Sequence, residues 1–229
     1  MDSAKKQKIQ RGAALVLFLS LAISAVYCIV RLVMTPEGGT VRTRSDYVLM
    51  LIQCVLGLAV MALPSLLARR WKLMLPTAMH VMYYAFLYCA IFLGEVFSFY
   101  YLIPHWDTIL HFSSGAMFAA LGFILIDFLN RDEHVRVSLS PFFASLFAFS
   151  FALAMGGVWE IYEYLADGLM GLNMQKFILA DGTVLSGRMA LTDTMEDIIV
   201  DAAAALSVAG IAYCVNPARK KHGGSEVNN

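Results

Sequence analysis

Charged residues are scarce in this sequence, and their scarcity excludes an ordinary water-soluble domain. Asp, Glu, Lys and Arg make up 15% of the 229 residues, whereas a soluble domain carries about 25%. Hydrophobic residues make up 59% of the chain. The formal net charge is zero, so bulk charge gives no reason to expect an acidic partner or a nucleic acid.

Cysteine is also rare, and the spacing of the four cysteines argues against a cysteine-based metal site. Each lies inside an apolar block, where we expect a buried free thiol. The residues are Cys28, Cys54, Cys89 and Cys214. A long linker and a low-complexity tract are missing as well, so we predict a single domain over residues 1–229.

The abundant feature is a series of apolar blocks, each about 20 residues long, which is the length that crosses ~30 Å of hydrocarbon. Only helices and closed barrels satisfy their backbone groups in lipid, and blocks of this length indicate helices. We therefore predict an all-α polytopic membrane bundle of six transmembrane helices. The first span is too long for a signal-peptide core and is expected to be retained. The predicted spans are about 12–34, 46–68, 73–97, 107–130, 139–166 and 191–215.

The distribution of basic residues between the loops predicts that both termini are cytoplasmic. Four basic residues fall on the predicted outer side: Arg42, Arg44, Lys176 and Arg188. Twelve fall on the opposite side: Lys5, Lys6, Lys8, Arg11, Arg69, Arg70, Lys72, Arg131, Arg136, Arg219, Lys220 and Lys221. The even number of spans agrees with this orientation.

One outer loop is longer than the others and covers residues 168–190. Within it, "FILADGTVL" places Asp-Gly between two apolar flanks, which is typical of a hairpin turn. We expect a small β-hairpin over the outer mouth of the bundle.

Acidic residues and one histidine enter the last three spans from the outer side. "WDTILH" places an acid and a histidine four residues apart at the start of the fourth span, on one helix face. The fifth span ends with two glutamates, and the sixth begins with aspartates at i, i+4 and i+8, a stripe about 12 Å long. The residues are Asp107, His111, Glu160, Glu163, Asp193, Asp197 and Asp201.

These acids need a positive partner, because a carboxylate in the membrane costs several kcal/mol and crowded like charges cannot all ionise. Together with Glu196 they number seven, and no Lys or Arg lies in the three spans. Protons, a bound cation, or Arg188 or Arg42 from a loop could neutralise them. A divalent metal ion (Mg²⁺, Mn²⁺, Fe²⁺ or Zn²⁺) is the most economical cofactor. We predict that metal ligands come from Asp107, His111, Glu160, Glu163, Asp193, Asp197 and Asp201, with Glu160 and His111 as catalytic residues.

Small and hydroxylated residues accompany the acids. Because small residues let membrane helices approach closely, they predict a tight core formed by the last three helices. These residues are Gly115, Ala119, Gly156, Gly157 and Ala202 to Ala205. The candidate hydrogen-bond donors to the site are Tyr164, Thr192 and Thr194.

Simpler interpretations exist for some of these residues. Asp107 and Asp193 could cap their helices, because Asp is favourable at a helix N-terminus. His111 alone could be a hydrogen-bonded structural histidine. Capping does not explain Asp197 or Asp201, which lie one and two turns inside the helix.

Three segments, "WDTILHFSSGAMFAALGF", "GGVWEIYEYLAD" and "LTDTMEDIIVDAAAA", together resemble the YjdF-like family of bacterial inner-membrane proteins of unknown function. The resemblance covers roughly residues 100–215 and implies a multi-pass protein of the bacterial cytoplasmic (inner) membrane. More distantly the segments resemble VanZ-type proteins, which tend to have Asn in the last helix where Asp197 and Asp201 stand here.

Three functions are compatible with this pattern. The first is a metal-dependent hydrolase or transferase acting on a membrane lipid or lipid-linked substrate at the outer leaflet. The second is a cation or proton-coupled transporter, although Asp127 is the only acid in the inner half of these spans. The third is a non-catalytic accessory or sensor protein whose acids form a structural network. These residues identify no protein partner.

Overall fold

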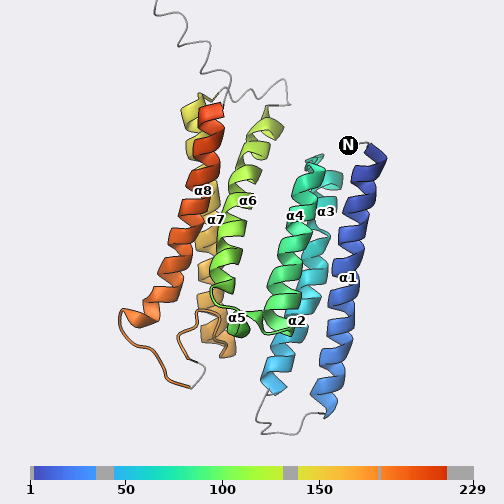
Figure 1. Ribbon diagram of the computed structural model, residues 1–229, viewed down its shortest axis with the longest axis vertical. Helices are drawn as coiled ribbons and strands as arrows, with labels where there is room; N and C mark the ends of the chain where they lie inside the picture. The colour runs from blue at the N-terminus through green and yellow to red at the C-terminus, as the bar shows by residue number, and fades with distance from the viewer. Residues whose placement is uncertain (1–2, 35–43, 131–138, 180–181, 216–229) are drawn as a thin grey trace, which may run out of the picture. The chain divides into compact units, whose positions relative to one another are not determined.

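A computed structural model describes residues 3–34, 44–130, 139–179 and 182–215, which are mostly helical (Figure 1). Arg42 lies outside these residues. Six helices are long and apolar enough to cross a membrane, which confirms the predicted number of spans. Their bounds are Ala4–Met34, Asp46–Trp71, Thr77–Val96, Trp106–Leu129, Pro141–Met170 and Met189–Val215. The cytoplasmic position of the termini stays a prediction.

The chain divides into two compact units, Met1–Trp106 and Asp107–Asn229. The single domain inferred from the sequence stays a prediction. The elements of the first unit are α1 (Ser3–Met34), α2 (Arg44–Met61), α3 (Leu63–Trp71), α4 (Thr77–Leu87), the π-helical segment η1 (Tyr88–Val96) and α5 (Phe99–Leu102). Pro64 lies in the first turn of α3, where proline is tolerated, and the second span is interrupted there.

The first unit packs around apolar side chains from α1, α2 and α4. Its main cluster of buried residues consists of Leu17, Leu21, Cys54, Tyr84 and Leu87. The four cysteines are free thiols; the prediction of burial is correct for Cys28 and Cys54 and wrong for Cys214, which is exposed.

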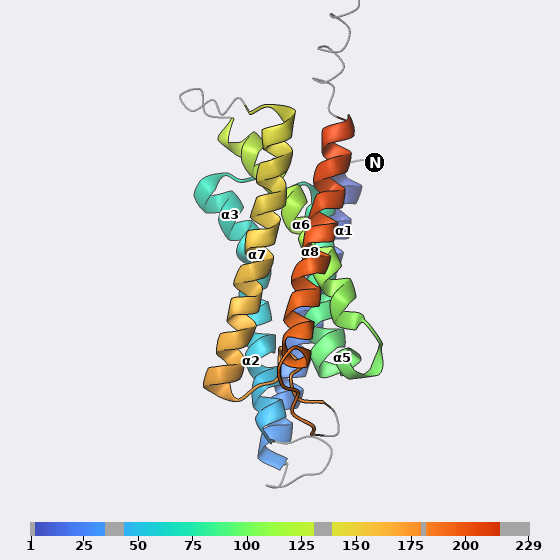
Figure 2. The ribbon, with the colours of Figure 1, turned by 90° about the vertical axis from the view of Figure 1, so that its left-hand side faces the viewer.

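The second unit contains three long helices, α6 (Trp106–Leu129, entering the unit at Asp107), α7 (Pro141–Met170) and α8 (Thr192–Val215), with a 3₁₀ turn η2 (Met189–Leu191) before α8. The helices run along one another in both views (Figures 1 and 2). Ser140 caps α7 by accepting a hydrogen bond from the Phe143 amide at 3.3 Å. Gly171 ends α7 in the left-handed conformation, with φ of 65°.

The second unit buries several acids and carries large apolar side chains on its outside, which a soluble domain rarely does. Ile161 and Ile199 are 60% and 61% exposed, whereas Glu160 and Asp201 on the same helices are 5% and 1% exposed. Intramembrane acids normally face the bundle interior in this way. Burial therefore agrees with a helix bundle surrounded by lipid.

Small residues bring the three helices together, as the sequence pattern predicts. Ala119, Ala152 and Ala205 form one fully buried cluster, each with 0% exposure. A Cβ placed on Gly122 would lie 2.8 Å from the Cα of Ala148. Gly157 differs from the expectation, because nothing lies within 4 Å of a Cβ at that position.

The loop between α7 and α8 contains one antiparallel bridge, between Ile178 and Val184. The amide of Leu179 donates to the Thr183 carbonyl at 2.9 Å, and the amide of Leu185 donates to Phe177 at 2.8 Å. Within the described residues this is a hairpin-like turn with a single bridge rather than two strands. Asp181 of the predicted Asp-Gly turn lies outside these residues.

Candidate functional site

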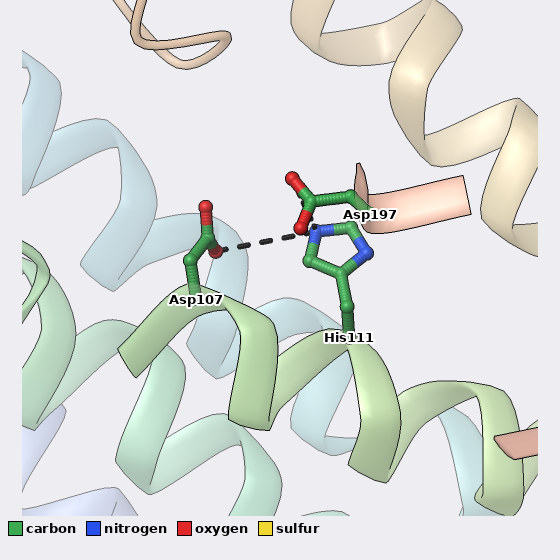
Figure 3. Close-up of side chains that lie close together, drawn as sticks. All are labelled: Asp107, His111 and Asp197. Atoms are coloured by element: carbon green, nitrogen blue, oxygen red, sulfur yellow. Dashed lines mark ion pairs between the residues drawn. The ribbon is translucent and has the colours of Figure 1, made fainter. Parts of the chain in front are cut away.

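Asp107 and His111 stand on one face of α6, one turn apart, at the start of the helix. Figure 3 shows both side chains directed toward Asp197 of α8. The starts of α6 and α8 lie at the same end of the unit (Figures 1 and 2). The first turns of α8, which carry Asp197, therefore lie opposite the face of α6 that carries Asp107 and His111. His111 and Asp197 are 5% and 3% exposed, so the group lies inside the unit.

Three carboxylates surround one ring nitrogen of His111. The Nε2 atom lies 4.0 Å from Asp107 Oδ1, 3.8 Å from Glu160 Oε1 and 3.7 Å from Asp197 Oδ2. These carboxylates come from α6, α7 and α8, respectively. All three distances exceed the length of a direct hydrogen bond. The nitrogen therefore forms no direct hydrogen bond with any of the three oxygens, and all four atoms face the same small region.

The other ring nitrogen has a direct partner. His111 Nδ1 lies 3.3 Å from Asp201 Oδ2, and an ionised carboxylate can only accept, so we assign the hydrogen to Nδ1. The Ser114 hydroxyl lies 3.4 Å from the second Asp201 oxygen. With Nδ1 donating to Asp201, a neutral ring directs its Nε2 lone pair at the three carboxylates.

With the His111 ring neutral, this arrangement has no positive charge among the three carboxylates that face Nε2. Both oxygens of Glu160 and Oδ2 of Asp197 are buried and accept no hydrogen bond from the described residues. A buried acceptor without a partner is destabilising by about 1–3 kcal/mol, and more when it is charged. A lone pair and several carboxylate oxygens facing one space need a proton or a cation between them.

The donor set fits a divalent metal ion. Asp107, His111 and Asp197 each offer a ligand atom, and these atoms lie within 4.8 Å of one another (Figure 3). Ligands bound at ~2.0–2.2 Å in tetrahedral geometry are separated by about 3.3–3.6 Å. Glu160 Oε1 lies 3.8 Å from Nε2 but outside the group whose ligand atoms all lie within 4.8 Å of one another, so it would have to move to become a fourth ligand. Small side-chain movements would close the set around an ion.

A loop lysine supplies the basic partner of Asp107. The Lys176 ammonium donates to Asp107 Oδ2 and lies 3.8 Å from Asp193 Oδ1. Arg188, one of the loop candidates for neutralising the acids, forms no ion pair within the part of the chain that the structure describes, and Lys176 takes this position instead. Asp107 therefore forms an ion pair with Lys176, so helix capping alone does not account for this residue.

The segment that carries Lys176 is anchored through Asp167, near the end of α7. Asp167 is 8% exposed and accepts from the amides of Met174 at 2.7 Å and Gln175 at 3.0 Å. The Gln175 amide side chain donates to Thr194 Oγ1 at 2.8 Å, which ties the segment to α8. These bonds hold the loop over the start of α6.

Replacing Asp167 with alanine is expected to release this loop, because two backbone donors lose a charged acceptor. Hydrogen bonds to charged groups contribute about 1.5–3 kcal/mol, so amide hydrogen exchange at Met174 and Gln175 should accelerate at least tenfold. Asp167→Asn, which keeps one acceptor oxygen, should show a smaller effect. Unchanged exchange in Asp167→Ala would show that other contacts hold the loop.

The remaining predicted residues lie around the centre in different ways. Glu163 is 5% exposed and accepts from Trp159 Nε1 at 2.8 Å, so its carboxylate is buried rather than on the surface. Tyr164 is 67% exposed and is not a donor to the site, contrary to expectation. Thr192 donates to the carbonyl of Arg188 at 3.1 Å. Glu196 is exposed.

Sequence reasoning missed several residues that the structure places at the centre. In the sequence, Lys176 enters only the count of basic residues on the outer side, and Asp167, the last residue of "GGVWEIYEYLAD", has no assigned role. A signal for Asp167 was present, because an acid at the C-terminal end of a helix is unfavourable unless it has specific partners. The contact of Ser114 with Asp201 joins residues that are 87 positions apart, and no local pattern predicts it.

Six candidate spans and a buried cluster of acids around a histidine define a polytopic membrane protein with a polar centre. The chain belongs to the family described as "Predicted membrane protein (DUF2238)", whose model matches residues 15–218. No curated protein and no solved structure shows a significant match to the chain. The YjdF-like and VanZ-like resemblances stay predictions, and membership of a family of predicted membrane proteins is confirmed.

Proposed function

We propose that the protein is a divalent-metal-dependent hydrolase or transferase of the bacterial cytoplasmic membrane. Its substrate would be a lipid or a lipid-linked molecule in the outer leaflet. One observation carries the proposal: His111 Nε2 faces oxygens of Asp107, Glu160 and Asp197. Oxygens of Glu160 and Asp197 are buried and have no hydrogen-bond partner among the residues that the structure describes. A divalent ion supplies the missing charge and uses all of these atoms.

The geometry suggests separate roles for the residues. His111 Nε2, Asp107 and Asp197 are the proposed ligands, and Glu160 is either a fourth ligand or the general base. Asp201 lies on the Nδ1 side of the ring, so we propose that it orients the imidazole rather than binding the ion. A divalent ion in this position would polarise a phosphoryl or acyl oxygen and make a water molecule more nucleophilic.

Water is the expected nucleophile in hydrolysis. The Ser114 hydroxyl donates to the backbone carbonyl of His111 at 2.9 Å and lies on the Asp201 side of the ring. It is therefore not placed for activation by Nε2. Both oxygens of Glu160 lack a hydrogen-bond partner within the described ranges, so we propose Glu160 as the residue that accepts a proton from water.

The exposure of the side chains indicates the direction of access. His111 is 5% exposed, whereas Asp107 and Lys176 are 19% and 30% exposed. A polar head group could therefore approach from the end where the loop lies. The apolar exterior of α7 and α8 would let the acyl chains of such a substrate stay in the bilayer.

The packing on the other side of the centre favours this function over transport. The layer of Ala119, Ala152 and Ala205, all with 0% exposure, follows Asp201 along the bundle. Asp127, further along α6, is exposed rather than directed into the unit. A proton or ion path needs polar groups or water along its length, and the side chains of this alanine layer are apolar and fully buried.

Metal analysis of the purified protein tests the proposal. Wild-type protein equilibrated with Mn²⁺ or Zn²⁺ and passed through gel filtration should retain about one ion per chain, and Asp197→Asn should retain much less. Glu196→Gln is the matched control, because Glu196 is an exposed acid one residue away on the same helix. Equal and negligible metal in all three proteins would refute the proposal.

A further inference from the structure

We propose that Lys176 fills the second cation position of a centre arranged for two cations, so that the site holds one divalent ion and one ammonium group. The inference rests on the proposed function and extends it. Many phosphoryl-transfer and hydrolytic sites use two metal ions about 3.5–4 Å apart, which share carboxylate ligands. The contacts of Lys176 match the second half of such a pair.

Asp107 has the position of a bridging carboxylate. Its Oδ1 atom faces the shared space at 4.0 Å from His111 Nε2. Its Oδ2 atom accepts a hydrogen bond from the Lys176 ammonium. One carboxylate therefore serves the proposed metal position with one oxygen and the ammonium with the other.

Asp193 is the second carboxylate beside the Lys176 ammonium. Its Oδ1 lies 3.8 Å from Lys176 Nζ. Its Oδ2 is buried and has no hydrogen-bond partner among the described residues. Among the described residues, oxygens of Glu160 and Asp197 also lack a hydrogen-bond partner. These acids can therefore hold more positive charge than the lysine supplies.

Charge counting leads to the same conclusion. A divalent ion and an ammonium group together bring three positive charges, whereas the centre contains five carboxylates. Removing the ammonium would leave a strongly negative position open, and such positions attract divalent cations. The acids of the centre are Asp107, Glu160, Asp193, Asp197 and Asp201.

The ammonium also lies on the accessible side of the centre. Lys176 is 30% exposed, and its segment is fixed by Asp167 and by the bond between Gln175 and Thr194. A fixed ammonium beside a metal ion can donate hydrogen bonds to an oxyanion of the substrate, the task that the second metal performs elsewhere. Lys176 would thus contact the substrate and make the centre work with one metal ion.

The test is to count metal ions in lysine variants. Full-length wild type, Lys176→Met, Lys176→Gln and Lys176→Arg are purified with Mn²⁺ present throughout. Bound Mn²⁺ is counted after gel filtration, and electron paramagnetic resonance reports whether two ions are magnetically coupled. Lys8→Gln, an exposed lysine of the first unit, is the control for loss of one positive charge.

The expected result is about one ion in wild type, Lys176→Arg and Lys8→Gln, and about two coupled ions in Lys176→Met and Lys176→Gln. Adding Asp193→Asn to Lys176→Met should return the count to about one. If both neutral variants bind only one Mn²⁺ per chain, without magnetic coupling, this inference is overturned while the proposed function stays intact. A wild type without metal would refute the proposed function itself. If both neutral variants are unfolded even with Mn²⁺ present, an ion cannot replace the ammonium, and the inference is likewise overturned.

Discussion

Gly115→Ala is expected to separate α6 from α8 and destabilise the second unit by about 1–3 kcal/mol or more. A Cβ on Gly115 would lie 2.8 Å from the carbonyl oxygen and 2.9 Å from the Cα of Asp201. Both are backbone atoms, so a side-chain rotation cannot relieve the clash. The helices must move apart, which also withdraws the Asp201 carboxylate from His111.

A nearby glycine provides the control for this substitution. Gly157 is also inside a helix, and a Cβ there would meet nothing within 4 Å. Gly157→Ala should therefore be neutral or stabilising by about 0.5–1 kcal/mol, because alanine restricts the unfolded backbone. The pair separates steric crowding from the general effect of removing a glycine.

The measurement is the unfolding midpoint of detergent-solubilised protein in a titration with SDS, followed by helical circular dichroism. Gly115→Ala should unfold at a clearly lower fraction of SDS than wild type, and Gly157→Ala should not. If Gly115→Ala proved as stable as Gly157→Ala, the close approach of α6 to Asp201 would be incorrect.

The helices of this protein could be predicted from its sequence because they depend on local composition. Apolar blocks about as long as a bilayer is thick indicate spanning helices whatever their neighbours are. Pro64 marks a break for an equally local reason. Helix ends were less accurate: α1 begins at Ser3, because the Lys and Gln residues before the apolar block are themselves good helix formers.

The candidate site could be predicted in part, because helix periodicity places residues on faces. The i, i+4, i+8 spacing of Asp193, Asp197 and Asp201 placed them on one stripe, and the structure shows exposure falling along it from 27% for the Asp193 side chain to 1% for Asp201. Spacing could not show which ring nitrogen of His111 each acid faces. That depends on the rotation of α8 about its axis, which packing against α6 and α7 decides.

The loop contribution could not be predicted, because a loop has no periodicity. Lys176 is 69 positions from Asp107, and its place depends on contacts of Asp167 and Gln175 with backbone and side-chain groups. Charge balance alone required protons, a bound cation or a basic side chain from a loop. It did not identify Lys176 rather than Arg188 as its source.

His111→Ala and Asp201→Asn are expected to weaken metal binding to very different degrees, because the first removes a ligand and the second removes its orienting partner. Loss of an outer-shell partner typically lowers metal affinity about 10–100-fold. Asp201→Asn keeps the shape of the side chain and an acceptor oxygen, so we expect a decrease in that range. His111→Ala should lower affinity by more than this and abolish activity.

Competition with a chromophoric chelator measures the dissociation constant for Mn²⁺ or Zn²⁺ in each variant, and thermal unfolding without metal shows whether each variant is folded. Asp201→Glu is not a suitable replacement, because a Cβ on Gly156 would lie 2.3 Å from Asp201 Oδ2 and a longer side chain has no room. A loss of metal in Asp201→Asn as complete as in His111→Ala would restore Asp201 to the ligands, as the sequence predicted. An unchanged affinity would instead mean that packing alone orients the imidazole, since the glycine-lined pocket around Asp201 leaves the ring little freedom to turn.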